Sequence, residues 1–308
     1  MTDTKIASGT PLVIAAHGTR DESGVAECRA LAERVANKLP DVPVELGFVE
    51  LAEPKIPEAV QAAVSQAPDA SEGTTEGETT EGEQPVSAVV VPLMFNTGGH
   101  VREDIPEAID EGRGDARVAY SAPLLPDVRM RKALDRRLAE TLAAGEGREE
   151  WRARDTAVVL VGRGALVADA NASHYTLTRM FWEENDLARV EPAFIQVTRP
   201  SVPEALTALH AQGAQQIVVQ GNFLFPGLLH VWMTEQVQAW QASHPGVEIR
   251  VAPVIGDCDE VAEVVVDRYR EPLDEVGLGE GAPVYMSGLR LQGRTVLVVG
   301  AGHVAERR

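Results

Sequence analysis

Residues 92–106 read PLMFNTGGHVREDIP and directly follow an apolar run at residues 87–91. The run is short and continuous, which is typical of a strand buried on both faces. A Gly-rich loop then presents His100 just before a helix that is expected to start at Asp104. Open α/β sheets place their chemistry in such loops, at the carboxyl ends of parallel strands. The stretch therefore predicts an α/β fold with a functional edge at His100.

The same alternation of strand and helix fills the first half of the chain. Strands are predicted at residues 11–16, 44–49, 86–91 and 116–121, and helices at residues 23–39, 56–64, 104–111 and 127–143. A βα unit that recurs four times implies a parallel sheet covered by helices on both faces. Residues 144–155 are charged and are predicted to be a linker.

The pattern restarts after this linker. Strands are predicted at residues 156–161, 190–197, 215–220 and 247–254, and helices at residues 171–185, 202–212, 228–242 and 257–271. The second half is thus expected to form a sheet of the same kind.

The restart is an internal repeat of the whole unit. FVELAEPKIPEA at residues 48–59 aligns with FIQVTRPSVPEA at residues 194–205, an offset of 146. Farther along, His100 aligns with His230 at an offset of 130, and the difference of 16 is the length of an acidic insert at residues 69–84. Agreement of several anchor points indicates a duplication. The predicted fold is two similar α/β lobes, residues 1–144 and 145–272, each a parallel sheet of about four strands flanked by helices, with a cleft between them.

Two segments fall outside this pattern. The insert reads DASEGTTEGETTEGEQ, and because it has almost no apolar side chain, residues 68–85 are expected to form a disordered loop. Residues 273–308 are predicted to be a linker followed by the opening of a dinucleotide-binding unit, a strand at 295–299 that runs into Gly300-x-Gly302. One βα turn cannot hold a dinucleotide, so no organic cofactor is expected.

Composition narrows the class of protein. The 308 residues are 44% hydrophobic and carry a formal net charge of −19, which argues against a general nucleic-acid-binding surface. No apolar run has the length of a membrane span, so no membrane partner is expected, and the first residues lack the pattern of a signal peptide. Two cysteines far apart do not form a disulfide framework. The chain is expected to be cytoplasmic.

Three side chains that can bind a metal follow successive strands of the first half: His17, Glu50 and His100. Carboxyl ends of parallel strands share one edge, so the three side chains are expected to converge there. Two imidazoles and a carboxylate suit divalent Fe, Co, Ni or Zn. A single strand-end histidine is more often a hydrogen-bonding or capping group. Three together, two of them replaced in the repeat by Arg163 and Gln196, favour a functional first lobe and a scaffolding second lobe.

Cationic side chains near the same edge are candidates for binding an anionic ligand. Arg20, Arg102 and Arg163 have the planar guanidinium that pairs with carboxylates, although ordinary surface ion pairing explains such residues as well. His230 in the second lobe contacts a ligand from across the gap or caps its own helix; the sequence leaves both open.

Motifs of the first lobe resemble a known family. AHGTRD at residues 16–21, FVE at 48–50 and PLMF at 92–95, followed by GH at 99–100, together resemble the sirohydrochlorin chelatases. These are class II tetrapyrrole chelatases that insert cobalt or iron. The resemblance spans roughly residues 11–270 and includes the long, duplicated form.

The resemblance implies a reaction and its residues. His17 and His100 correspond to the catalytic, metal-binding histidines, and Glu50 to a carboxylate ligand. Fe²⁺ or Co²⁺ is then a substrate, and sirohydrochlorin, an anionic tetrapyrrole, is the partner molecule. Residues expected to contact it are Arg20, Gly98, Gly99, Arg102, Arg163 and His230. The tail resembles the start of precorrin-2 dehydrogenase, which suggests an association with that enzyme and favours iron insertion into siroheme over cobalt insertion toward cobalamin.

Other functions remain open at this point. A chelatase for another tetrapyrrole would use the same residues with nickel or cobalt. A carrier of metal or tetrapyrrole would bind without chemistry. A two-lobe binding protein of the periplasmic type is disfavoured by the missing signal-peptide pattern.

Overall fold

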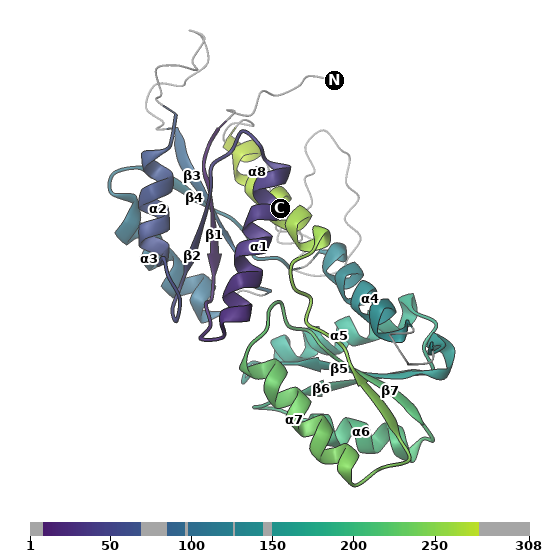
Figure 1. Cartoon of the computed structure of the whole chain (residues 1–308). Coiled ribbons are helices and arrows are strands. Elements are labelled where there is room, and N and C mark those ends of the chain that lie inside the picture. The colour runs from purple at the N-terminus through teal and green to yellow at the C-terminus, as the bar shows by residue number, and fades with distance from the viewer. Residues whose placement is uncertain (1–8, 69–84, 96–97, 126, 144–149, 277–308) are drawn as a thin grey trace, which may run out of the picture.

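The computed structural model describes residues 9–68, 85–95, 98–125, 127–143 and 150–276 (Figure 1). The predicted disordered insert and the dinucleotide-binding-like tail from residue 277 lie outside the described residues, as do residues 144–149 of the predicted linker. None of the helices in the described ranges is both long and apolar enough to cross a bilayer.

The first lobe contains a parallel sheet with the strand order β2-β1-β3-β4. Its strands are β1 (Leu12–Ala16), β2 (Val44–Phe48), β3 (Val86–Pro92) and β4 (Arg117–Tyr120). The helices that follow them are α1 (Glu22–Lys38), α2 (Ile56–Ser65), α3 (Ile105–Arg113) and α4 (Val128–Leu142).

The second lobe repeats the arrangement, with the strand order β6-β5-β7-β8. Its strands are β5 (Ala157–Gly162), β6 (Arg189–Phe194), β7 (Gln216–Gly221) and β8 (Glu248–Val251), and its helices α5 (Ala168–Glu184), α6 (Val202–Ala211), α7 (Leu228–Ala242) and α8 (Asp259–Val276). The prediction of two four-stranded parallel α/β lobes is confirmed. The cleft between them stays a prediction.

Burial explains why the central strands form. Every residue of β1 and β5 is buried, and both strands are continuous apolar runs, as a parallel strand covered on two faces requires. Helices α1 and α4 each begin after an aspartate whose side chain caps the first turn. Asp21 accepts a hydrogen bond from the backbone N–H of Ser23, and Asp127 from that of Arg129.

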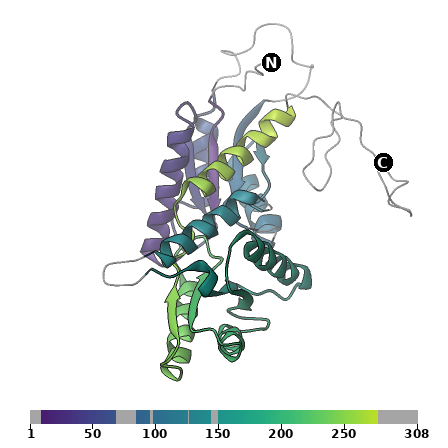
Figure 2. The ribbon, with the colours of Figure 1, turned by 90° about the vertical axis from the view of Figure 1, so that its right-hand side faces the viewer.

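The last helix of each repeat packs on the other lobe, which the strand and helix pattern did not predict. Helix α8 packs against α1 and β3 of the first lobe, and α4 packs against α5 and β7 of the second (Figures 1 and 2). The Tyr269 hydroxyl of α8 donates to the Thr10 carbonyl at 2.7 Å, and the buried Gln220 side chain of β7 donates to the Leu134 carbonyl of α4 at 2.7 Å. The predicted division at residue 144 follows the repeat, whereas the packing exchanges these two helices.

The exchange produces one continuous core between the sheets. One cluster of buried side chains joins α1 and α8 on the first sheet to α4 and α5 on the second. A separate cluster under α2 and α3 covers the outer face of the first sheet, and another under α6 and α7 covers that of the second. The two lobes therefore depend on each other for burial of their inner faces.

Helix α8 is also longer than predicted. It extends to Val276, beyond the expected end of the second lobe at residue 272, and Pro272 lies inside it. Proline inside a helix removes one backbone hydrogen bond and usually marks an end. Helix α8 nevertheless continues past the proline, and it packs against α1 and α4.

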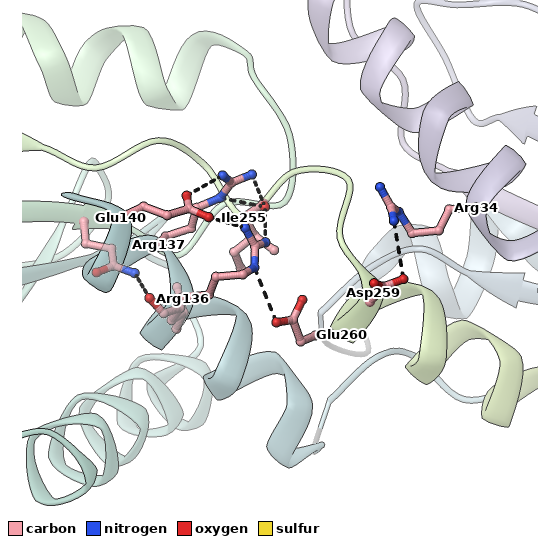
Figure 3. Close-up of polar contacts among 9 residues, drawn as sticks. Arg34, Arg136, Arg137, Glu140, Ile255, Asp259 and Glu260 are labelled. Atoms are coloured by element: carbon pink, nitrogen blue, oxygen red, sulfur yellow. Dashed lines mark hydrogen bonds and ion pairs between the residues drawn. The ribbon is translucent and has the colours of Figure 1, made fainter. Parts of the chain in front are cut away.

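A polar cluster holds the segment that leads into α8 (Figure 3). The Arg137 guanidinium donates to the Ile255 carbonyl at 2.8 Å and pairs with Glu140 at 2.7 Å. Arg34 of α1 donates to both carboxylate oxygens of Asp257, at 2.6 and 2.8 Å. Two-pronged pairing of this kind fixes orientation as well as distance. The cluster therefore anchors the crossing from the second lobe back to the first.

Gly256, at the centre of this cluster, has a φ of +67°. A Cβ there would lie 2.6 Å from Glu27 Oε2 and 2.8 Å from Arg137 Nη2. Gly256→Ala is expected to lower the free energy of unfolding by about 1–3 kcal/mol, because the left-handed backbone and the crowding both disfavour a side chain. Chemical denaturation measures the change. Gly246→Ala, where a Cβ meets nothing within 4 Å, is the matched control, and equal stability of the two variants would contradict the expectation.

Candidate functional site

Three side chains predicted to bind a metal lie at the carboxyl edge of the first sheet. His17 follows β1, Glu50 follows β2, and His100 opens a π-helical turn after β3 (η1, His100–Asp104). His17 Nε2 lies 3.9 Å from Glu50 Oε1. The rings of His17 and His100 are perpendicular, with centroids 4.6 Å apart. His17 thus contacts both of the other predicted ligands.

Close packing of two backbone segments brings His17 and Glu50 together. The Glu50 N–H donates to the His17 carbonyl at 3.1 Å. Gly18 has a φ of +91°, and a Cβ on it would overlap the Glu50 carbonyl oxygen. Only glycine allows this approach. The glycine after His17 therefore sets the spacing of the two side chains.

Each histidine has its Nδ1 against an oxygen acceptor. His17 Nδ1 lies 3.1 Å from the Gly18 carbonyl oxygen, which can only accept, so this ring nitrogen is the donor. His100 Nδ1 contacts the Asp104 carboxylate. Both contacts leave Nε2 as the nitrogen with a lone pair for a metal, which is the usual arrangement of metal-binding histidines.

The sequence prediction for Asp104 was incomplete. The helix was expected to start at Asp104, but the helical turn already starts at His100, and the Asp104 side chain makes no capping hydrogen bond. Instead it holds His100 from one turn away. The spacing of four residues between histidine and aspartate was the available signal, because residues four apart on a helix are neighbours.

A hydrogen bond from the neighbouring strand supports the π-helical turn. In this geometry an N–H bonds to the carbonyl five residues earlier, so the Val101 carbonyl would need the N–H of residue 106. Residue 106 is proline and has none. The Tyr120 hydroxyl of β4 donates to the Val101 carbonyl at 2.9 Å instead. The turn that carries His100 and Asp104 is therefore tied to the sheet.

Exposure of the site leaves room for an incoming metal. The side chains of His17, Glu50 and His100 are 44%, 52% and 37% exposed. Within the described parts of the chain, no group of three or more His, Cys, Asp and Glu side chains is positioned to hold a metal ion as it stands, and this includes His17, Glu50 and His100. The arrangement is a pair of imidazoles and a carboxylate on an open rim, unlike a closed structural site.

The residues predicted to bind an anion are placed as follows. Arg20, Arg102 and Arg163 are exposed and form no ion pair with any described residue, so the alternative of ordinary surface pairing has no support in the described residues. Gly98 and Gly99 precede His100 and have open space where a Cβ would be. All five positions are therefore accessible to a ligand.

His230 stands in the first turn of α7. Burial lowers the pKa of this imidazole, which favours its neutral form. Its Nδ1 is buried and has no hydrogen-bond partner among the described residues. Its backbone N–H donates to the Gly227 carbonyl at 3.0 Å. The side chain does not cap its helix through an observed hydrogen bond.

The edge that carries His230 adjoins the edge that carries His17. A Cβ on Gly24 of α1 would lie 2.5 Å from the Pro226 carbonyl oxygen, and one on Gly227 would lie 3.8 Å from Thr19 Oγ1. The loop from β7 to α7 therefore packs on the loop from β1 to α1. The carboxyl edges of the two sheets therefore adjoin at these loops.

Comparisons with known proteins agree with this architecture. The CbiX family model matches residues 11–141 and 157–272. A protein of Priestia megaterium named sirohydrochlorin cobaltochelatase is 29% identical over 261 residues, which is 84% of this chain and 78% of the relative. A second protein of that organism, named sirohydrochlorin ferrochelatase, is 26% identical over 265 residues, 85% of this chain and 90% of the relative.

The structure described as SirB from Bacillus subtilis with Fe³⁺ has a TM-score of 0.67 and 24% identity, and the match covers 87% of this chain and 96% of that one. This likeness confirms the fold. Because the family model spans both lobes over most of their length, the chain belongs to the CbiX family.

Proposed function

We propose that this chain inserts Fe²⁺ or Co²⁺ into sirohydrochlorin. The observation that carries the proposal is the contact of His17 with both Glu50 and His100, with each histidine engaged at Nδ1 and open at Nε2. Relatives named for cobalt and for iron insertion support this reaction, and family membership supports it over the whole two-lobe unit. Fe²⁺ and Co²⁺ both suit nitrogen and carboxylate ligands.

The metal is a substrate that must be bound and then released. His17, Glu50 and His100 are the proposed ligands. Their exposure fits a site that exchanges metal, because a closed four-ligand site would hold it too firmly. No organic cofactor is required by this reaction.

Charge balance defines the proton chemistry. Two pyrrole N–H protons leave as one divalent metal enters the ring. When His17 or His100 gives up the metal, its Nε2 lone pair is free to accept one of these protons, and imidazole has a suitable basicity for this step. The second proton passes to solvent, to which the site is open. Asp104 keeps the His100 ring in the tautomer with the proton on Nδ1.

The anionic periphery of the ring needs local cations, since the chain as a whole has a net charge of −19. Arg20, Arg102 and Arg163 are the proposed partners of its carboxylates, with the backbone amides of Gly98 and Gly99 and the side chain of His230 as further contacts. The proposal places the reaction in the cytoplasm, and association with precorrin-2 dehydrogenase is part of it.

His100→Ala is expected to abolish metal insertion while leaving the fold intact, because the side chain lies on an exposed rim. Absorbance spectra of sirohydrochlorin with Fe²⁺ or Co²⁺ measure turnover. His244→Ala, in the loop after α7, is the control that keeps activity. Undiminished turnover in His100→Ala would remove His100 from the mechanism, and saturation of the wild-type signal at one ring per chain would indicate a carrier.

Asp104→Ala is expected to weaken Co²⁺ binding by about 10- to 100-fold, which is typical for the loss of a group that orients a metal-binding histidine. Asp104→Asn keeps an oxygen acceptor and should recover part of the affinity. Calorimetric titration with Co²⁺ provides the measurement. Glu103→Ala removes a neighbouring exposed carboxylate of equal charge, and an equal loss in that variant would show that charge alone, not contact with His100, is responsible.

A further inference from the structure

Two residues outside the proposed ligand set share an unusual backbone conformation. Leu51 has a φ of +62° and Val197 a φ of +71°, and they are the only non-glycine residues in the described ranges with positive φ. Such values are rare for residues with a Cβ, and a β-branched residue such as valine is disfavoured most. The two positions correspond in the repeat, at the same offset of 146.

Each residue is the centre of a three-residue turn. The Ala52 N–H donates to the Glu50 carbonyl at 2.8 Å, and the Thr198 N–H donates to the Gln196 carbonyl at 2.8 Å. A hydrogen bond between residues two apart, around a central residue with positive φ, defines the rare and strained form of the γ-turn. Strain of this kind collects at functional sites.

The turns also expose apolar side chains. Leu51 is 44% exposed and Val197 is 55% exposed. Glycine would fit this backbone without strain, and asparagine or aspartate would fit better than leucine or valine. The chain keeps an exposed apolar side chain on strained backbone at both places, so neither local conformation nor burial explains the choice.

Comparison of the two lobes shows that the strained turn does not depend on the proposed metal ligands. The second lobe has Gln196 where the first has Glu50, and Arg163 where the first has His17. Yet Gly164, at a φ of +88°, packs on the Gln196 carbonyl as Gly18 packs on that of Glu50. The turn is kept where the metal ligands are absent. What both lobes share is the apolar side chain at the carboxyl edge of the sheet.

We infer that Leu51 and Val197 are contacts for the apolar ring of the macrocycle, one from each lobe. The inference rests on the proposed function. A tetrapyrrole has a flat, apolar ring with carboxylates only at its periphery, so its binding site needs apolar side chains beside the cations. Leu51 directly follows the proposed ligand Glu50. Val197 lies at the matching edge of the second lobe, whose loop from β7 to α7 packs on the first lobe's edge near Thr19.

The test uses four variants of the full chain: Leu51→Gly, Leu51→Ala, Val197→Gly and Val197→Ala. Metal-free sirohydrochlorin, titrated without metal and followed by absorbance, is the probe. Each variant is expected to bind it about five- to tenfold more weakly, because an apolar contact is lost. Each glycine variant should melt at a higher temperature than the alanine variant at the same position, the reverse of the usual order, because glycine relieves the strain.

The pattern of affinity and stability decides the outcome. Weaker binding in both variants at each position, with the glycine variant the more stable, supports the inference. Affinity equal to that of the wild type at either position would overturn the inference. A loss of affinity that parallels the loss of melting temperature across the four variants would overturn it as well, because general destabilisation would then explain the weaker binding. Met180→Ala, which removes an exposed apolar side chain of α5, should bind like wild type.

Failure of the proposed function gives a different result. If the wild-type chain neither binds sirohydrochlorin nor inserts metal into it, the proposed function is wrong and this inference is wrong with it. If the wild type binds and inserts metal while the Leu51 and Val197 variants bind equally well, only the inference is wrong.

Discussion

The site depends on one close approach of two backbone segments. Gly18 lies so near the Glu50 carbonyl that no side chain fits between them, and the Glu50 N–H bonds to the His17 carbonyl. This contact sets the separation of His17 and Glu50 and fixes the start of the turn around Leu51. The same contact between Gly164 and Gln196 occurs in the second lobe. The backbone of the site is thus duplicated, whereas the proposed metal ligands His17 and Glu50 have no counterpart of the same type in the second lobe, where Arg163 and Gln196 stand.

Hydrogen bonds offset the backbone strain in the loops at the carboxyl edges of the two sheets. A residue with a Cβ in left-handed backbone costs on the order of 1–3 kcal/mol. Hydrogen bonds at both ends of each turn hold it in place. The His100 turn follows the same logic: Pro106 removes a donor, and the Tyr120 hydroxyl from β4 replaces it. The sheet supports irregular loops that could not persist alone.

Much of the architecture could be predicted from the sequence. Buried parallel strands can be read from continuous apolar runs in the sequence, such as those of β1 and β5. The repeat at an offset of 146 residues predicted that the second half forms a matching sheet. The order of residues at strand ends predicted that His17, Glu50 and His100 would share an edge. Periodicity carried no signal for the π-helical turn, and the hydrogen bond from Tyr120 to the Val101 carbonyl that supports it joins residues distant in sequence. The exchange of α4 and α8 between the lobes could not be predicted either, because an apolar helix face does not specify which sheet it packs against.

The exchanged helices connect this chain to domain swapping. In each repeat the final helix leaves its own sheet and covers the inner face of the other. A single repeat whose final helix stayed in this orientation would leave the inner face of its sheet partly bare. Two identical copies could then cover each other by trading that helix, since an identical element exchanged between protomers needs no new interface chemistry. The tandem chain has the geometry of such a swapped pair whose partners have become covalently joined, and this joining allows the two copies to differ at their carboxyl edges, as His17 and Arg163 do.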